Sequence, residues 1–226
     1  MTRDGWILLA VFCAALLLLA YPLGRYICAV MQGRLRLACR LEAPLYRACG
    51  IRADTEMGWL QYALAILLFN ALGALAVYAL QRLQAWLPLN PQGMAAVGPD
   101  SAFNTAISFA TNTNWQGYVG ETSMSYLTQM LGLSVQNFLS AATGIAVVVA
   151  LIRGFAGHTA KGIGNAWVDL TRATLWILLP LALLFALLLV QQGVVQNFDA
   201  YRQLHTLEGP TQTLAMGPVA SQEAIK

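Results

Sequence analysis

Four long apolar runs constrain this chain more than any other feature. They cover residues 6–21 (extendable to 31 if Arg25 reaches back to the interface), 60–80, 126–152 and 173–190. A helix needs about 20 apolar residues to cross a hydrocarbon layer of about 30 Å. Only 10% of the residues are charged, whereas a soluble domain has about 25%. The sequence therefore predicts an all-α polytopic membrane protein.

The distribution of basic residues predicts how these spans are oriented. Two connecting segments are basic, and the bases are Arg25, Arg34, Arg36, Arg40, Arg47 and Arg52 after the first span, and Arg153, Lys161 and Arg172 after the third. The segment between the second and third spans has one base, Arg82. The positive-inside rule puts the basic segments in the cytoplasm and the N-terminus outside. Because a signal peptide has its positive charge before the apolar run, we expect the first span to be uncleaved.

The outer segment between the second and third spans contains the candidate functional site. Asp100 or Ser101 can cap a helix, and residues 102–110 predict a helix that is too short to span. This helix runs directly into TNTNWQG at residues 111–117, a segment rich in carbonyl and hydroxyl oxygens and free of charged side chains. Such oxygens can replace the water of a dehydrated alkali cation, and the helix C-terminus adds partial negative charge. The alternative is an ordinary outer loop whose Asn and Thr side chains form turns.

A short internal repeat favours the pore interpretation. GPDSA at residues 98–102 is followed by Ala106-Ile107, and GPVAS at residues 217–221 is followed by Ala224-Ile225. Both copies follow a span that runs from inside to outside. Many transport pores enclose their path with repeated units of one topology.

These segments resemble the potassium-translocating A subunit of bacterial Kdp potassium-transporting ATPases. The matching stretches are LPLNPQ (87–92), SFATNTNWQGYVGET (108–122), LSVQNFLSAATGIAV (133–147), GNAWVDL (164–170) and MGPVASQEAIK (216–226). Members of this family resemble potassium channels, with four helix–pore loop–helix repeats around one filter and an extra first helix. The resemblance implies an extra helix and basic cytoplasmic loop in residues 1–58, a first pore repeat in 59–153, and an incomplete second repeat in 154–226.

The resemblance also implies a length difference. A complete member of the family is more than twice as long as this chain, which stops inside the second pore helix. One filter loop cannot form a four-walled site. We therefore expect a truncated product, a fragment or one piece of a split protein, inactive when alone.

The resemblance assigns one wall of a potassium filter to the outer loop. Its residues are Thr111, Asn112, Thr113, Asn114, Gln116 and Gly117. Backbone carbonyls are expected to supply most ligands, with the Thr113 hydroxyl as an addition. Gln116 stands where potassium channels often have glycine, and Gly117 can supply unusual backbone torsions.

Several polar residues near the loop have two interpretations each. Glu121 either adds negative potential at the outer mouth or is a solvated residue beside the third span. Asn70, Gln136 and Asn137 either bond across helices or face the ion path. Ser140 and Gly144 have a small-xxx-small spacing, which predicts close helix packing.

No pattern in the chain indicates a catalytic or transition-metal site. The cysteines at 13, 28, 39 and 49 form no C-x-x-C pair, His158 and His205 are far apart, and no Walker A segment is present. A net charge of +3 does not indicate a nucleic-acid partner. The resemblance places ATP hydrolysis on the B subunit of the Kdp complex, a P-type ATPase, which is accompanied by the small C and F subunits. The basic loops contact either this P-type ATPase or membrane lipid.

The sequence thus predicts a potassium-binding, channel-like subunit of an ATP-driven uptake complex in the bacterial inner membrane. The alternative is a non-conducting membrane scaffold or assembly subunit. An intramembrane enzyme is disfavoured, because the spans contain no paired acids, Ser/His pair or metal ligands.

Overall fold

The computed structural model describes residues 2–157, 162–207 and 209–225, so His158 and Lys161 lie outside the described residues. The chain divides into two compact units, Met1–Ala53 and Asp54–Lys226. Within the described residues, four helices are long and apolar enough to cross a membrane. The prediction of an all-α polytopic protein is therefore confirmed in its main feature.

The first unit consists of α1 (Arg3–Met31) and α2 (Arg36–Ala48). The first span thus takes its longer form, and Pro22 lies inside it. Helix α2 was expected to be only a basic loop. It is amphipathic, with exposed leucines at positions 37, 41 and 45, and its 13 residues are too few to span a bilayer.

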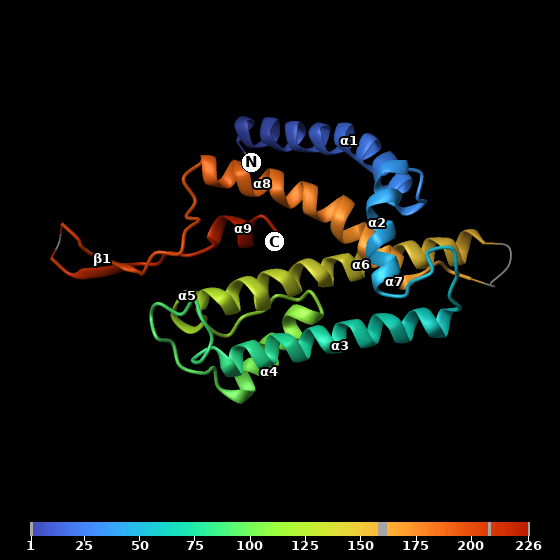
Figure 1. Cartoon of the computed structure of the whole chain (residues 1–226). Coiled ribbons are helices and arrows are strands. Elements are labelled where there is room, and N and C mark those ends of the chain that lie inside the picture. Colours follow the sequence, from blue (N-terminus) through green and yellow to red (C-terminus); the bar gives the residue numbers. More distant parts are fainter. Residues whose placement is uncertain (1, 158–161, 208, 226) are drawn as a thin grey trace. The chain divides into compact units, whose positions relative to one another are not determined.

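The second unit begins with a helical hairpin whose arms are α3 (Trp59–Leu83) and the continuous helix of η1 (Thr128–Ser134) and α6 (Val135–Ala156). Helix α4 (Pro99–Ala110) packs against both arms (Figure 1). A buried apolar cluster joins them and contains Val77, Ala106, Phe109, Met124 and Leu133. The short helix is therefore held within the hairpin and does not lie outside it.

Helix α4 begins earlier than the sequence predicts. Gly98 is its N-cap and Pro99 its first residue, without a side-chain cap, so the expected caps at Asp100 and Ser101 are wrong. Proline fits the first helical position because its φ is already helical and its missing N–H would have no partner there. Asp100 lies in the first turn, where its charge is favourable to the helix dipole.

The fourth span is also longer than predicted. It joins α7 (Ala166–Arg172), η2 (Ala173–Leu178) and α8 (Leu179–Gln191) into one helix of 26 residues. Asn165 caps it by accepting from the backbone N–H of Trp167. The π-helical turn η2 ends just before Pro180, where the proline ring disfavours a regular α-helical turn.

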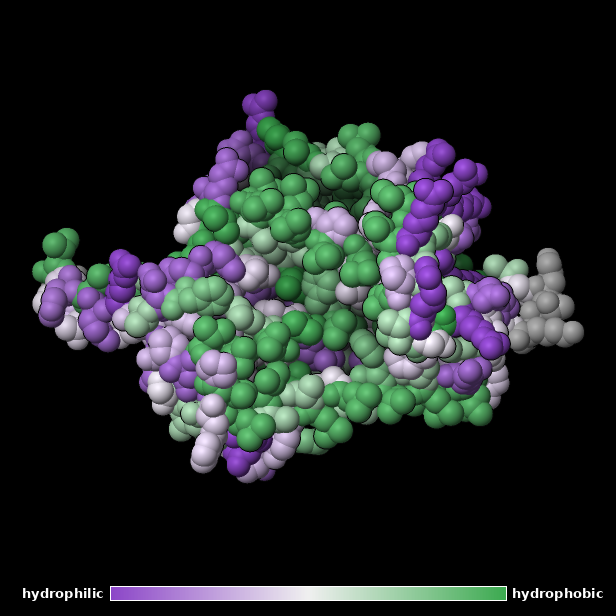
Figure 2. All heavy atoms as spheres, in the orientation of Figure 1, coloured by the Kyte–Doolittle hydropathy of each residue, from purple (hydrophilic) through white to green (hydrophobic). Residues whose placement is uncertain are grey.

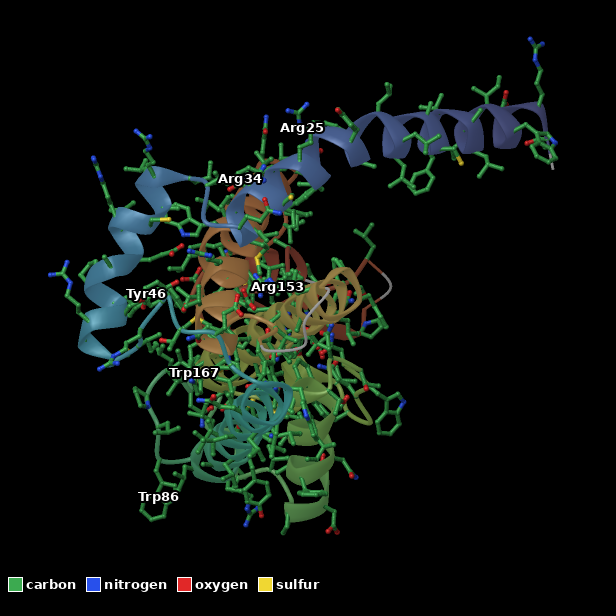
Figure 3. The ribbon with its side chains drawn as sticks, turned by 90° about the vertical axis from the view of Figure 1, so that its right-hand side faces the viewer. Arg25, Arg34, Tyr46, Trp86, Arg153 and Trp167 are labelled. Atoms are coloured by element: carbon green, nitrogen blue, oxygen red, sulfur yellow. The ribbon has the colours of Figure 1, made fainter. Side chains whose placement is uncertain are left out.

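The earlier start is possible because the charge of Asp169 is paired. Asp169 is 1% exposed and bonds the Arg153 guanidinium at 2.5 and 3.0 Å. The Tyr62 hydroxyl lies 3.0 Å from both the Asp169 carboxylate and the Ala146 carbonyl. Figure 3 shows Arg153 among the helices of this end of the unit. These contacts tie α3, α6 and α7 together.

The remaining elements lie at the other end of the unit. They are α5 (Gly120–Ser123), the antiparallel strands β1 (Arg202–His205) and β2 (Thr211–Leu214), and α9 (Val219–Glu223). In the hairpin, Arg202 pairs with Leu214 and His205 with Thr211, and both strands are exposed. Figure 2 shows mostly hydrophilic residues over this hairpin and hydrophobic residues along the flank of α3. An all-α prediction missed the hairpin.

We predict that Asp169→Ala lowers the free energy of unfolding by about 3 kcal/mol or more, because it leaves Arg153 half-buried without its carboxylate. Asp199→Ala is the matched control, since it removes an aspartate from an exposed pair with Arg202 and should cost less than about 1 kcal/mol. Unfolding of the purified protein in detergent measures both. If both variants lowered the free energy of unfolding equally, the conclusion that the Arg153–Asp169 pair holds the three helices together would be contradicted.

Candidate functional site

The loop after α4 lies midway along the two arms of the hairpin. A cavity of about 700 Å³ is lined by Thr111 and Asn112 of the loop together with Asn70 of α3 and Ser140 of α6. Asn70 is close to the middle of α3, and Ser140 is close to the middle of the helix formed by η1 and α6. The loop therefore reaches the middle level of helices long enough to span.

The backbone of the loop alternates in handedness. The torsion φ is −88° at Thr111, positive at Asn112 (56°) and Asn114 (54°), and not positive at Thr113. Asparagine tolerates the left-handed region better than most residues with a Cβ. Gly117 does not have a positive φ, so the unusual torsions expected there fall on the two asparagines instead.

Backbone N–H groups of the loop turn back to the end of α4. Those of Thr113 and Asn114 both donate to the Ser108 carbonyl, at 2.9 and 3.2 Å. The N–H of Thr111 donates to Ile107, and the N–H of Asn112 donates to Phe109. The C-terminal carbonyls of α4 thus satisfy these four donors.

The carbonyl groups of the loop behave differently. Among the described residues, no hydrogen-bond donor reaches the backbone oxygen of any residue from 111 to 118. The Thr111 and Thr113 hydroxyls lie 2.9 Å apart. Thr111, Asn112 and Thr113 are exposed, so the backbone oxygens there are accessible to water or to a cation.

Side chains of the loop are bonded to α6. The Asn114 amide donates to the Asn137 side-chain oxygen at 2.7 Å, and the Ser140 hydroxyl donates to the Asn112 side-chain oxygen at 3.3 Å. Of the polar residues left open by the sequence, Asn137 therefore bonds across to the loop. Ser140, which the sequence suggested only for packing, was missed as a loop contact.

The other polar residues within the arms make different contacts. Asn70 donates to the Ile66 carbonyl at 2.8 Å and to the Thr143 hydroxyl at 3.3 Å. The Gln136 amide lies over Gly73, where a Cβ would collide with it. Asn70 therefore bonds α3 to α6 and also lines the cavity shared with Thr111 and Asn112, whereas Gln136 packs closely against α3.

The Trp115 ring lies beside Gly117 at the end of the loop. A Cβ on Gly117 would lie 3.2 Å from the Trp115 ring, so the glycine permits this close approach. Gln116 is partly buried. Glu121 is exposed in α5, and its carbonyl accepts from the Tyr201 hydroxyl at 2.6 Å. Burial, with help from Tyr126 and Glu121, raises the pKa of Tyr201 to about 12, so this hydroxyl remains a donor at neutral pH.

Gln84, just after α3, bonds three backbone groups of the chain around α4 and α5. Its amide nitrogen donates to the carbonyls of Ala95 and Ser123 at 2.6 and 2.8 Å, and its amide oxygen accepts from the N–H of Ser125 at 3.1 Å. Gln84 is fully buried. One side chain thus joins the segments before and after the loop. Trp86 extends outward two residues later (Figure 3).

Within the described residues, no group of three or more His, Cys, Asp and Glu side chains could hold a metal ion. His205 is in the exposed strand β1, and the cysteines of the described chain form no disulfide. What the unit offers a ligand near the loop is neutral oxygen.

Four long apolar helices, with an irregular oxygen-rich loop at mid-level, define a multi-pass membrane protein. The family model for the potassium-transporting ATPase A subunit, KdpA, matches residues 10–226. The chain belongs to this family.

Similar proteins are named potassium-transporting ATPase potassium-binding subunits. Those of Dechloromonas aromatica and Methylibium petroleiphilum are 64% and 65% identical over the whole chain, which covers 43% and 40% of their lengths. That of Variovorax paradoxus is 63% identical and is covered to 41%. The chain spans about two fifths of the length of these curated relatives.

We predict that Gln84→Glu destabilises the protein at neutral pH. The change replaces the amide nitrogen, which donates to the Ala95 and Ser123 carbonyls, by a carboxylate oxygen that can only accept. The cost should be about 2 kcal/mol or more, from two carbonyls left without a donor and a buried charge. Burial raises the pKa of the new carboxyl, so the folded state prefers its protonated form. Stability should therefore be regained at low pH and lost as pH rises through that raised pKa.

Unfolding of the variant as a function of pH measures this effect. Gln203→Glu in the exposed strand β1 is the matched control and should change the free energy by less than about 0.5 kcal/mol. A pH-independent cost, or none, would contradict the role given to Gln84.

Proposed function

We propose that this chain is the N-terminal part of a potassium-binding and translocating channel-like subunit in an ATP-driven potassium uptake complex. The observation that carries the proposal is the run of backbone carbonyls at residues 111–118, to which the described residues offer no donor. The names of the relatives, which are potassium-binding subunits, support the same ion.

In the proposed mechanism, potassium enters from the outer side and exchanges its water for these carbonyls. Thr111, Asn112, Thr113, Asn114, Gln116 and Gly117 form one wall of the filter. The Thr113 hydroxyl is an added ligand, and Glu121 adds weak negative potential at the mouth. The C-terminus of α4 points its partial negative charge at the ion. The ion is held by neutral oxygens, so it can also leave.

The proposal concerns the complete subunit, because one loop supplies one wall. We assign residues 1–58 to an extra helix and cytoplasmic segment, 59–153 to the first pore repeat, and 154–226 to the start of a second. In support, Gly98-Pro99 begins α4 and the repeated Gly217-Pro218 directly precedes α9. The two glycines differ in backbone, with φ −54° at Gly98 and 131° at Gly217.

Energy is proposed to come from a partner chain. We assign ATP hydrolysis to a P-type ATPase, the B subunit of the Kdp complex, with the small C and F subunits in the same assembly. The basic residues around α2 would contact this P-type ATPase or anionic lipid. We assign the protein to the bacterial inner membrane, as the family resemblance implies, and the positive-inside rule puts its N-terminus outside.

A non-conducting scaffold subunit is the alternative, and a cysteine in the loop separates the two. Asn114 is unsuitable because its amide bonds Asn137 and its φ is 54°. Thr113 is exposed and is the better position. In the full-length subunit, Thr113→Cys should react with an outer-side thiol reagent, and potassium but not sodium should slow the reaction.

The control is Gln212→Cys, on the exposed strand β2. Its labelling rate should be the same with and without potassium. Both variants belong in a cysteine-free background within the assembled complex. A Thr113 thiol that reacts at one rate with and without potassium supports a scaffold.

We also predict that Gln116→Arg in the full-length subunit raises the potassium concentration for half-maximal transport at least about 100-fold. A fixed cation about 4 Å from the ion costs about 4 kcal/mol at a protein dielectric of about 20, and every 1.4 kcal/mol is about tenfold. Gln212→Arg adds the same charge on the exposed hairpin and should leave the dependence unchanged. Unaltered potassium dependence in Gln116→Arg would count against the filter.

A further inference from the structure

Both left-handed residues of the loop have their side chains bonded to one helix. Asn114 donates to Asn137 at 2.7 Å. The single proton of the Ser140 hydroxyl is shared between the Asn137 carbonyl at 3.0 Å and the Asn112 side-chain oxygen at 3.3 Å. Asn137 and Ser140 are 3% and 4% exposed. They are three residues apart on α6, so they share a face of the helix. Thus α6 presents two polar groups to the loop.

These bonds are placed where the backbone needs support. A residue with a Cβ is unfavourable in the left-handed region, and asparagine enters it most readily when its short side chain is hydrogen-bonded. The two amides also bond one another, from Asn114 to Asn112 at 3.4 Å. The two loop residues with positive φ are thus the two whose side chains bond α6.

We infer that Asn137 and Ser140 are positioning residues that set potassium selectivity by holding Asn112 and Asn114 in their left-handed conformation. This inference rests on the proposed function of the loop. The handedness of a residue sets the direction of the peptide units on either side of it. Loss of either contact allows peptide groups to rotate, and the oxygens then no longer define one cation size.

The chain offers a matched pair for comparison. Asn70 donates to the Thr143 hydroxyl at 3.3 Å, which joins α3 to α6 through the same kind of bond. Thr143 is three residues beyond Ser140, and its hydroxyl donates to the Leu139 carbonyl at 3.0 Å. Its hydroxyl makes no hydrogen bond to the loop in the described part of the chain. Thr143→Val therefore removes an interhelical bond and leaves the loop contacts in place.

The experiment uses the full-length subunit in its assembled complex and measures transport against potassium and rubidium concentration. Asn137→Ala and Ser140→Ala should each raise the half-saturating potassium concentration by about three- to tenfold, the value of one neutral hydrogen bond. The preference for potassium over rubidium should fall. The maximal rate and the amount of complex should stay unchanged, as should all these quantities in Thr143→Val.

A double-mutant cycle tests the direct contact. Asn114→Gly removes the amide and keeps the left-handed backbone accessible. The double variant with Asn137→Ala should have the same half-saturating potassium concentration as the more affected single variant, because both changes break the same hydrogen bond. If the fold-increases of the two single variants instead multiplied in the double variant, the direct contact between Asn114 and Asn137 would be overturned.

Other outcomes also decide the question. If Gln116→Arg alters the potassium dependence but Asn137→Ala and Ser140→Ala do not, this inference fails while the proposed function stands. If none of the three alters it, the proposed function fails as well. An equal loss of maximal rate or of assembled complex in Thr143→Val and the two alanine variants would show general destabilisation and overturn the positioning role.

Discussion

The structure depends on one constraint, that backbone polar groups at the middle of long apolar helices must have partners. The loop at residues 111–117 meets it unevenly. Its first N–H groups are satisfied by the end of α4, and the Asn114 amide nitrogen and the Asn112 side-chain oxygen bond α6. Its carbonyl oxygens receive no donor from the described residues. An irregular segment of this kind is tolerated at membrane depth where it is covered by protein or lines a wet path, and its free oxygens suit a cation.

The rest of the helical unit holds this loop in place from both ends. At one end, Arg153, Asp169 and Tyr62 join three helices through a buried ion pair. At the other end, Gln84 joins the chain before and after the loop through three backbone contacts. Between them, small buried residues such as Ala106 and Ala142 bring the helices close together. The loop is short, so its geometry is set mainly by these surroundings.

The sequence predicted the four spans and the position of the loop, because apolar runs and oxygen-rich segments are local patterns. It missed α2, whose alternation of arginine and leucine has too little hydropathy to stand out. The sequence prediction started the fourth span only after Arg172, because Asp169 looks unpaired in the local sequence. Its partner, Arg153, lies 16 residues away. The contact between Ser140 and Asn112 spans 28 residues, so no local pattern could reveal it. The sequence pointed to Gly117 as a source of unusual backbone torsions, whereas left-handed torsions occur at two asparagines whose side chains bond a distant helix.

The central claim is that the carbonyls of residues 111–118 face a dehydrated cation. The most direct measurement is anomalous diffraction from the full-length complex soaked with thallium or rubidium in place of potassium. The account predicts an anomalous peak within coordination distance of these carbonyl oxygens, and its loss in Gln116→Arg. Peaks elsewhere in a transport-competent complex, with none beside this loop, would contradict it.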